Sequence, residues 1–226
     1  MTERGVKRFG EDVLPFYGST DRRIFEIERR CMDRDGVVIS FLDGLLPPGL
    51  VLDVGAGDGF TAERLSRPGR TVVAMEPDPG MVAPERTLVW ASGVAQDIPF
   101  HDRSFDAAYS TWAYFLSGVE SESIERGLRE VQRVVRAGGP IVVVDNAGGD
   151  EFAALTERPL AGDPARWVEW GFEAQVLRTS FRFDSLDEAR ELLGYYFGEG
   201  VGERVTSTEV GYSVAAYTAA SGEVKV

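Results

Sequence analysis

The chain has 226 residues, of which 43% are hydrophobic and 27% are charged, as is typical of a globular domain with a full core. Its net charge of −13 disfavours a nucleic-acid partner, because such proteins bind phosphates through a basic face. One cysteine and one histidine allow neither an internal disulfide nor a metal site of usual ligand spacing. The polar first ten residues and the lack of a long apolar run predict a soluble, cytoplasmic protein without a membrane partner.

The predicted elements begin with a loose leader over 1–18 and a helix over 21–46, which Ser19 or Thr20 caps and two prolines end. Strands and helices then alternate. The strands are expected at 50–54, 71–76, 87–91, 104–110 and 140–145, and the helices at 60–66, near Pro79 and at 121–136. This alternation predicts an α/β fold, a doubly wound, Rossmann-like and mostly parallel sheet with helices on both faces.

After residue 146 the pattern changes. Short helices are expected at 151–158 and 164–174, a strand within 173–183, a helix at 185–197 and a last strand at 204–219. The last strand is expected to be antiparallel and to close the same sheet.

A glycine loop follows the first predicted strand, with Gly55, Gly57 and the adjacent Asp53 and Asp58. A dinucleotide fingerprint would need its third glycine at position 60, which is Phe60. Two carboxylates would also repel a pyrophosphate, whereas a ligand with a cationic end and no phosphate tolerates them. The loop therefore favours a cationic nucleoside such as S-adenosylmethionine over a dinucleotide.

The segment Asp-Val-Gly-Ala-Gly-Asp-Gly at 53–59 resembles the first motif of the class I S-adenosylmethionine-dependent methyltransferases. Three further stretches resemble that family in the right order: an acid before an apolar residue and Pro at 97–99, Pro-Phe-x-Asp-x-Ser-Phe-Asp at 99–106, and Gly-Gly before the strand at 140–145. The resemblance implies one domain in three parts. These are a leader and lid helix (1–46), an S-adenosylmethionine-binding core (47–146), and an acceptor-shaping insert with the end of the sheet (147–226).

Ligands of doubly wound sheets bind at the carboxyl ends of the strands. Glu76 follows Asp53 by 23 residues, a spacing that predicts a carboxylate for the ribose hydroxyls, unless it only closes a turn. The resemblance implies that Asp97 accepts from the adenine amino group and that the Ile98 amide and side chain meet the ring, unless Asp97 only caps its loop. Asp53, Glu76 and Asp97 would then form an acidic rim suited to a cationic cofactor. The expected cofactor-binding residues are Tyr17, Asp53, Gly55, Ala56, Gly57, Glu76, Pro77, Asp97, Ile98, Ser110 and Thr111.

Methyl transfer from a sulfonium depends mainly on alignment, although a hydroxyl acceptor would also need a general base. His101 and Tyr114 are the candidate catalytic residues, with Asp145 as a rival and a plain surface role as the alternative for His101. The aromatic residues Trp112, Tyr114 and Phe115 are expected to wall the acceptor pocket. Plain core packing is the alternative, and it is favoured for Phe115. The resemblance makes Tyr17 a lid over the cofactor and 159–183 the specificity segment, although simple burial explains its two tryptophans equally well.

These features predict transfer of a methyl group to an oxygen or nitrogen of a small molecule that is neutral or cationic and partly apolar. The expected assembly is a monomer or a homodimer. An alternative is a regulatory or scaffold protein that binds S-adenosylmethionine without turnover. A nicotinamide-dependent reductase is disfavoured by Phe60, and an RNA methyltransferase by the net charge of −13.

Overall fold

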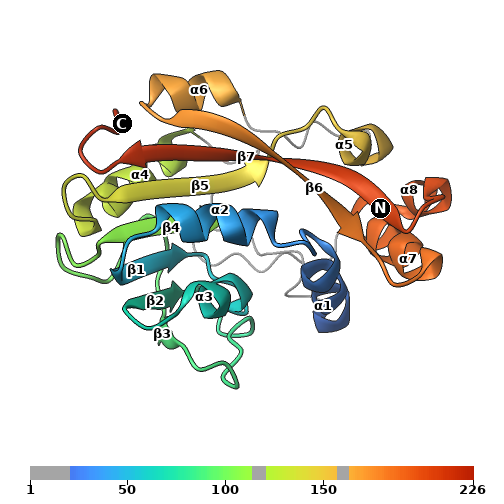
Figure 1. Cartoon of the computed structure of the whole chain (residues 1–226), viewed down its shortest axis with the longest axis horizontal. Coiled ribbons are helices and arrows are strands. Elements are labelled where there is room, and N and C mark those ends of the chain that lie inside the picture. The colour runs from blue at the N-terminus through green and yellow to red at the C-terminus, as the bar shows by residue number, and fades with distance from the viewer. Residues whose placement is uncertain (1–20, 114–120, 157–162) are drawn as a thin grey trace.

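A seven-stranded sheet runs through the described part of the chain, residues 21–113, 121–156 and 163–226, in the computed structural model (Figure 1). Its strand order is β3-β2-β1-β4-β5-β7-β6. The strands are β1 (Gly49–Val54), β2 (Arg70–Met75), β3 (Val89–Ala91), β4 (Ala107–Thr111), β5 (Pro140–Asn146), β6 (Glu173–Arg182) and β7 (Glu209–Ala220). The first five strands are parallel, and β7 is antiparallel to both of its neighbours. The predicted doubly wound fold with an antiparallel last strand is confirmed.

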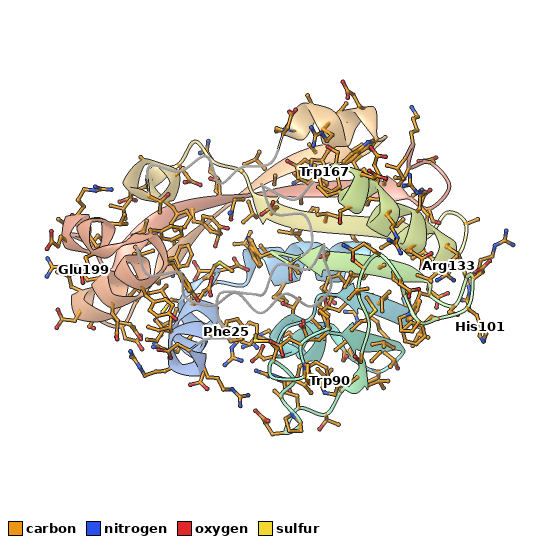
Figure 2. All side chains as sticks on the ribbon, turned by 180° about the vertical axis from the view of Figure 1, so that it is seen from behind. Phe25, Trp90, His101, Arg133, Trp167 and Glu199 are labelled. Atoms are coloured by element: carbon orange, nitrogen blue, oxygen red, sulfur yellow. The ribbon has the colours of Figure 1, made fainter. Side chains whose placement is uncertain are left out.

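Helices cover both faces of this sheet (Figures 1 and 2). They are α1 (Arg22–Cys31), α2 (Val37–Leu45), α3 (Phe60–Leu65), α4 (Ser121–Val134), α5 (Glu151–Thr156), α6 (Pro164–Glu169), α7 (Leu186–Phe197) and α8 (Glu199–Arg204). Leu42, Leu65 and Leu192 belong to the core on the face of α2, α3 and α7. Leu128 and Trp167 belong to the core on the opposite face. Strands β1, β2, β4, β5 and β7 therefore contribute alternate side chains to two separate cores.

The long helix predicted over 21–46 is wrong, because the chain forms two helices there. Asp33 takes φ 52 and Gly36 takes φ 70, left-handed values that end one helix before the next begins. The Asp33 carboxylate accepts hydrogen bonds from the amides of Val37 and Val38, each at 2.9 Å, and so caps α2. It also accepts from Thr179 Oγ1 in β6 at 2.7 Å. The break turns α1 away from α2, and this places α1 beside the ends of the strands (Figure 1).

Other elements also differ from expectation. No helix forms near Pro79, where the chain makes turns between β2 and β3. The last strand begins at Glu209 because α8 occupies 199–204. The cap of α1 is Asp21, whose side chain accepts from the amides of Arg23 and Ile24, while the expected caps Ser19 and Thr20 lie outside the described residues.

The segment expected to shape the acceptor pocket packs elsewhere in its described part. Trp167 and Trp170 are buried on the face that α4 covers, and the Trp167 ring stacks on Tyr217 with centroids 4.8 Å apart. Simple burial, the alternative reading of these tryptophans, is therefore what the structure shows.

The leader 1–18 with Tyr17, and the predicted pocket residues Tyr114 and Phe115, lie outside the described residues. Within the described ranges, no helix is long and apolar enough to cross a membrane. The cytoplasmic location stays a prediction.

The Asp33 turn generates a prediction about stability. Replacing Asp33 with alanine removes the cap of α2 and leaves an alanine at φ 52, so the free energy of unfolding should fall by about 1–3 kcal/mol. Asp33→Asn keeps an acceptor and tolerates the left-handed conformation, so it should lose less. Urea denaturation measures both, with the exposed Asp35→Ala as the control, and equal losses for all three would contradict the capping role.

Candidate functional site

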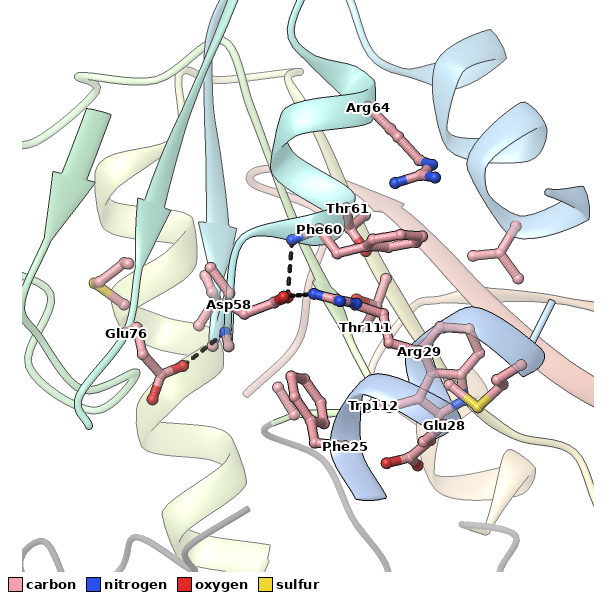
Figure 3. Close-up of a pocket in the computed structure, with 18 of the residues that line it drawn as sticks. Phe25, Glu28, Arg29, Asp58, Phe60, Thr61, Arg64, Glu76, Thr111 and Trp112 are labelled. Carbon is pink, nitrogen blue, oxygen red and sulfur yellow. Dashed lines mark hydrogen bonds and ion pairs between the residues drawn. The ribbon is translucent and has the colours of Figure 1, made fainter. Parts of the chain in front are cut away.

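A cavity of about 520 Å³ opens at the carboxyl ends of β1, β2 and β4, between the glycine loop and α1 (Figure 3). Parallel strands bring their carboxyl ends to one edge, and the loops that follow them leave a crevice there. The volume lies within the range of small-molecule sites. Lining residues from the predicted cofactor set are Gly55, Ala56, Gly57, Glu76, Pro77 and Thr111.

The glycine loop forms one wall of this cavity. Gly55 and Gly57 have φ values of 78 and 56, which side chains rarely adopt. A Cβ at Gly55 would lie 2.5 Å from the Cβ of Ala113, so only glycine lets the loop approach the end of β4. The Gly57 amide donates to Glu76 Oε2 at 2.8 Å and so ties the loop to the end of β2.

Glu76 is the lining carboxylate at the tip of β2. Its Oε1 accepts from the Asp78 amide at 2.9 Å, and its Oε2 accepts from the Gly57 amide. Each oxygen keeps a further lone pair for a ligand hydroxyl. Burial raises the pKa of Glu76 to about 7, against the lowering effect of these two backbone amides. The group is therefore placed to accept hydrogen bonds from a ribose diol, and it titrates near neutrality.

The expected acidic rim does not form, because Asp53 lies below the cavity surface and outside its lining. Its side chain points into the core beside the neighbouring strand, where its Oδ2 accepts from Tyr109 Oη at 2.9 Å. Its Oδ1 is buried without a hydrogen-bond partner in the described structure. Burial raises the pKa of Asp53 to about 7, and the hydrogen bond from Tyr109 opposes this.

Asp97 and Ile98, which the resemblance placed at the adenine, do not line this cavity. The Asp97 side chain is exposed and lies outside the cavity lining. Ile98 is buried in the core of the α4 face, and its amide donates to Glu130 Oε2 at 2.9 Å. The Ile98 amide, which the resemblance placed against the adenine ring, is therefore already hydrogen-bonded within the protein. The four residues before this pair, 93–96, line the cavity instead.

Ser110 does not line the cavity, and its expected place at the cofactor stays a prediction. Its hydroxyl donates to the Val54 carbonyl oxygen at 2.9 Å and is buried between β4 and β1. Thr111, the next residue, does line the cavity, because successive side chains of a strand point in opposite directions.

His101 lies far from the cavity, in an exposed loop at the other side of the molecule from Phe25 of α1 (Figure 2). The physical reason is topological: this loop precedes β4, so it lies at the amino edge of the parallel strands. The rival candidate Asp145 is buried, accepts from the Asn146 amide and does not line the cavity. Neither position suits a general base for a ligand at the carboxyl edge.

The opposite wall of the cavity comes from α1, which the sequence did not assign to the site beyond a lid. Arg29 forms an ion pair with Asp58 of the glycine loop, and Arg86 approaches the same carboxylate at 3.0 Å. The Phe60 ring lies beneath the Arg29 and Arg64 guanidinium groups, 5.2 and 3.5 Å from its centroid. Asp58 is thus neutralised by the protein itself and does not provide the free negative charge inferred from the sequence.

Trp112 lines the cavity at the end of β4, as predicted. It takes φ 47, an unusual value for a bulky side chain, and its amide donates to the Val144 carbonyl oxygen at 2.9 Å. Its indole Nε1 donates to Tyr212 Oη at 2.8 Å, and that hydroxyl bonds Asn146. A strained backbone and a hydrogen-bonded ring together hold this aromatic wall in one orientation.

Glu28 brings a second carboxyl group to this side of the cavity, near Trp112 and Phe25 (Figure 3). Its Oε2 accepts from Tyr196 Oη of α7 at 2.6 Å. Burial raises the pKa of Glu28 to about 7, and the tyrosine hydrogen bond opposes this. No motif spacing pointed to Glu28, because α1 meets the strand ends only through the turn at Asp33.

Across the described ranges, no cluster of three or more His, Cys, Asp or Glu side chains is arranged to hold a metal ion. The cavity instead offers Glu76 at the tip of β2, Glu28 on α1, and the aromatic side chains of Phe25 and Trp112 near Glu28.

Comparison with known sequences identifies relatives of this chain. A family model for the methyltransferase domain matches residues 52–143. Demethylmenaquinone methyltransferase from Thermobifida fusca is 32% identical over 133 residues, 55% of this chain and 50% of that protein. Sarcosine/dimethylglycine N-methyltransferase from Halorhodospira halochloris is 29% identical over 163 residues, 67% of this chain and 56% of that protein. The chain spans about half the length of the curated relatives it matches.

Solved structures share the fold. A methyltransferase from an antibiotic biosynthesis pathway of Anabaena variabilis, itself assigned only provisionally, aligns with a TM-score of 0.61 at 19% identity, over 85% of this chain and 99% of that one. A possible histamine N-methyltransferase from Thermotoga maritima aligns with a TM-score of 0.56 at 20% identity, over 89% of this chain and 97% of that one. At these identities the likeness concerns the fold alone.

The buried Asp53 generates a prediction about pH and stability. Its pKa is about 7 in the folded chain and about 3.9 when unfolded, so between these values the folded state holds the extra proton. Raising the pH from 5 to 8 therefore lowers the free energy of unfolding, by at most about 1.4 kcal/mol per pH unit from this group. Asp53→Asn removes that contribution and should flatten the pH dependence in urea denaturation. The exposed Asp97→Asn is the matched control and should keep the wild-type slope.

Proposed function

This chain belongs to the class I S-adenosylmethionine-dependent methyltransferase family, and we propose that it transfers a methyl group to an oxygen or nitrogen of a small molecule. The proposal rests on one observation: the glycine loop and Glu76 are joined by the hydrogen bond from the Gly57 amide to Glu76 Oε2, and both line the same cavity. This pair presents backbone groups and a carboxylate where a nucleoside would lie.

The cofactor assignment rests on the residues at the carboxyl edge. When bound, S-adenosylmethionine would supply a methyl group on a positively charged sulfur, so that an acceptor lone pair could attack the methyl carbon directly, with the sulfur as the leaving group. Glu76 would accept hydrogen bonds from the ribose, and residues 93–96 would flank the base. Gly55, Gly57 and Thr111 would adjoin the amino-acid end, with no Cβ at either glycine to obstruct it.

The acceptor would occupy the part of the cavity next to α1 and Trp112. Aromatic walls and a nearby carboxyl group suit a neutral or cationic, partly apolar molecule. The relatives named above act, by their names, on a demethylated quinone and on sarcosine or dimethylglycine, both small molecules. The protein would contribute mainly by holding donor and acceptor in line and by keeping water out of the reacting space.

Glu76 provides the direct test of the cofactor site. Calorimetry with S-adenosylhomocysteine should show binding to the wild type at pH 8. Glu76→Gln should weaken that binding about tenfold or more, because an amide accepts fewer hydrogen bonds and carries no charge. The affinity of the wild type should also fall as the pH drops from 8 to 6, through the pKa of about 7 at which Glu76 becomes protonated.

The matched control is Glu85→Gln, which makes the same charge change at an exposed site outside the cavity. An absence of heat with the wild type, or an unchanged affinity in Glu76→Gln, would overturn the proposal. Binding without release of S-adenosylhomocysteine from any acceptor would favour the regulatory alternative.

A second prediction is that replacing His101 changes neither the binding of S-adenosylhomocysteine nor the reaction rate. His101→Ala should bind S-adenosylhomocysteine as the wild type does, and should release it at the wild-type rate with any accepted substrate, because the loop before β4 is remote from the cavity (Figure 2). A loss of more than about tenfold in rate without a loss of stability would show that His101 takes part in catalysis.

A further inference from the structure

Among the residues that the structure describes, five carboxyl groups line the cavity, and they make different contacts. They belong to Glu28, Asp33, Asp58, Glu76 and Asp78. Four have defined tasks within the fold: Asp33 caps α2, Asp58 pairs with two arginines, Glu76 holds the glycine loop, and Asp78 accepts from the Gly80 amide at 2.8 Å. Glu28 has no such task, because no backbone amide and no cation of the described chain bonds it.

Glu28 is held in place by one hydrogen bond. Tyr196 Oη donates to its Oε2 at 2.6 Å, whereas its Oε1 has no partner among the described residues. The neighbouring cations on α1 are engaged elsewhere, since Arg29 pairs with Asp58, and Arg30 pairs with Asp184 and Glu188. One carboxylate oxygen at the cavity wall therefore remains available to a ligand.

The surroundings place this oxygen beside the acceptor space. Tyr196 comes from α7 and Tyr212 from β7. The pKa of Tyr212 is raised mainly by burial and by the charge of Asp145, and the charge of Glu28 adds to this effect. Tyr212 in turn accepts from the Trp112 indole at the tip of β4. Figure 3 shows Glu28 next to Trp112 and Phe25, with Glu76 on the other side of the view.

Within the proposed function, on which this inference rests, we propose that Glu28 binds the reacting N–H or O–H group of the acceptor. Its Oε1 accepts a hydrogen bond from that group and points the lone pair of the acceptor atom at the donor methyl. As the new bond to carbon forms, the carbon–sulfur bond breaks and its electron pair stays on sulfur. The acceptor's proton passes to the Glu28 carboxylate and then to water, so the products are the methylated acceptor, S-adenosylhomocysteine and one proton.

This assignment narrows the acceptor class. A carboxylate in a cavity that Phe25, Met32 and Trp112 also line favours an amine or a hydroxyl compound with an apolar body over an anionic molecule. Burial also raises the Glu28 pKa to about 7, so the group takes and returns a proton near neutral pH.

The test compares two nucleosides that differ at the reacting centre. Sinefungin carries an amine-bearing carbon in place of the methylated sulfur, so its ammonium group stands where the methyl group would be, whereas S-adenosylhomocysteine has no charge there. Calorimetry on the full chain gives the ratio of their affinities for the wild type, Glu28→Gln and the control Glu26→Gln, an exposed change on the same helix. Glutamine at position 28 still accepts from Tyr196, so the variant keeps that contact.

We expect the preference for sinefungin at pH 8 to fall about tenfold in Glu28→Gln and to stay unchanged in Glu26→Gln. In the wild type it should fall between pH 8 and pH 6, as Glu28 is protonated, and in Glu28→Gln this fall should be smaller. The hydrogen bonds between Glu76 and the ribose cancel in the ratio, because both nucleosides share the ribose, whereas the charge of Glu76 acts on the ammonium group in wild type and variant alike. Equal ratios in wild type and Glu28→Gln, with S-adenosylhomocysteine still bound, would overturn this inference alone. A wild type that binds neither nucleoside would overturn the proposed function and this inference with it.

Discussion

The ion pair between Arg29 of α1 and Asp58 of the glycine loop is the contact on which the cavity depends. It joins a helix from the start of the described chain to the tip of the first strand, and so closes the space between them into a site. Removing these charges from water is costly, and burial lowers the pKa of Arg29. Its main effect is therefore to fix the orientation of α1, which places Phe25 and Glu28 on the cavity wall.

The same pair sets the electrostatics of the site. Once Arg29 and Arg86 neutralise Asp58, Glu76 and Glu28 remain as the lining carboxylates whose pKa burial raises to about 7. They lie on different walls, one tied to the glycine loop and the other to α7. A cationic donor between them would favour their ionised forms. In the proposed cofactor site, the negative charge would thus come from two separate positions rather than from an acidic rim at the strand tips.

The second half of the chain supports the site through hydrogen bonds to residues that line the cavity. Tyr196 of α7 holds Glu28, and Tyr212 of β7 holds the Trp112 indole. Both tyrosines lie outside the motifs quoted above, yet both hold residues that line the cavity. In the proposed function, acceptor choice would therefore depend on α1 and the end of β4, together with the support that α7 and β7 give them.

The sequence by itself determined the sheet, the glycine loop after β1 and the place of Glu76 at the end of β2, because strands, glycine turns and their spacing are local features with a regular period. It also indicated that Trp112 would face the site. Only the tertiary structure decided that Asp53 is buried against Tyr109, that Ile98 gives its amide to Glu130, and that Glu28 reaches the cavity. These outcomes depend on contacts between residues 32 to 168 positions apart, for which neither periodicity nor motif spacing carries a signal.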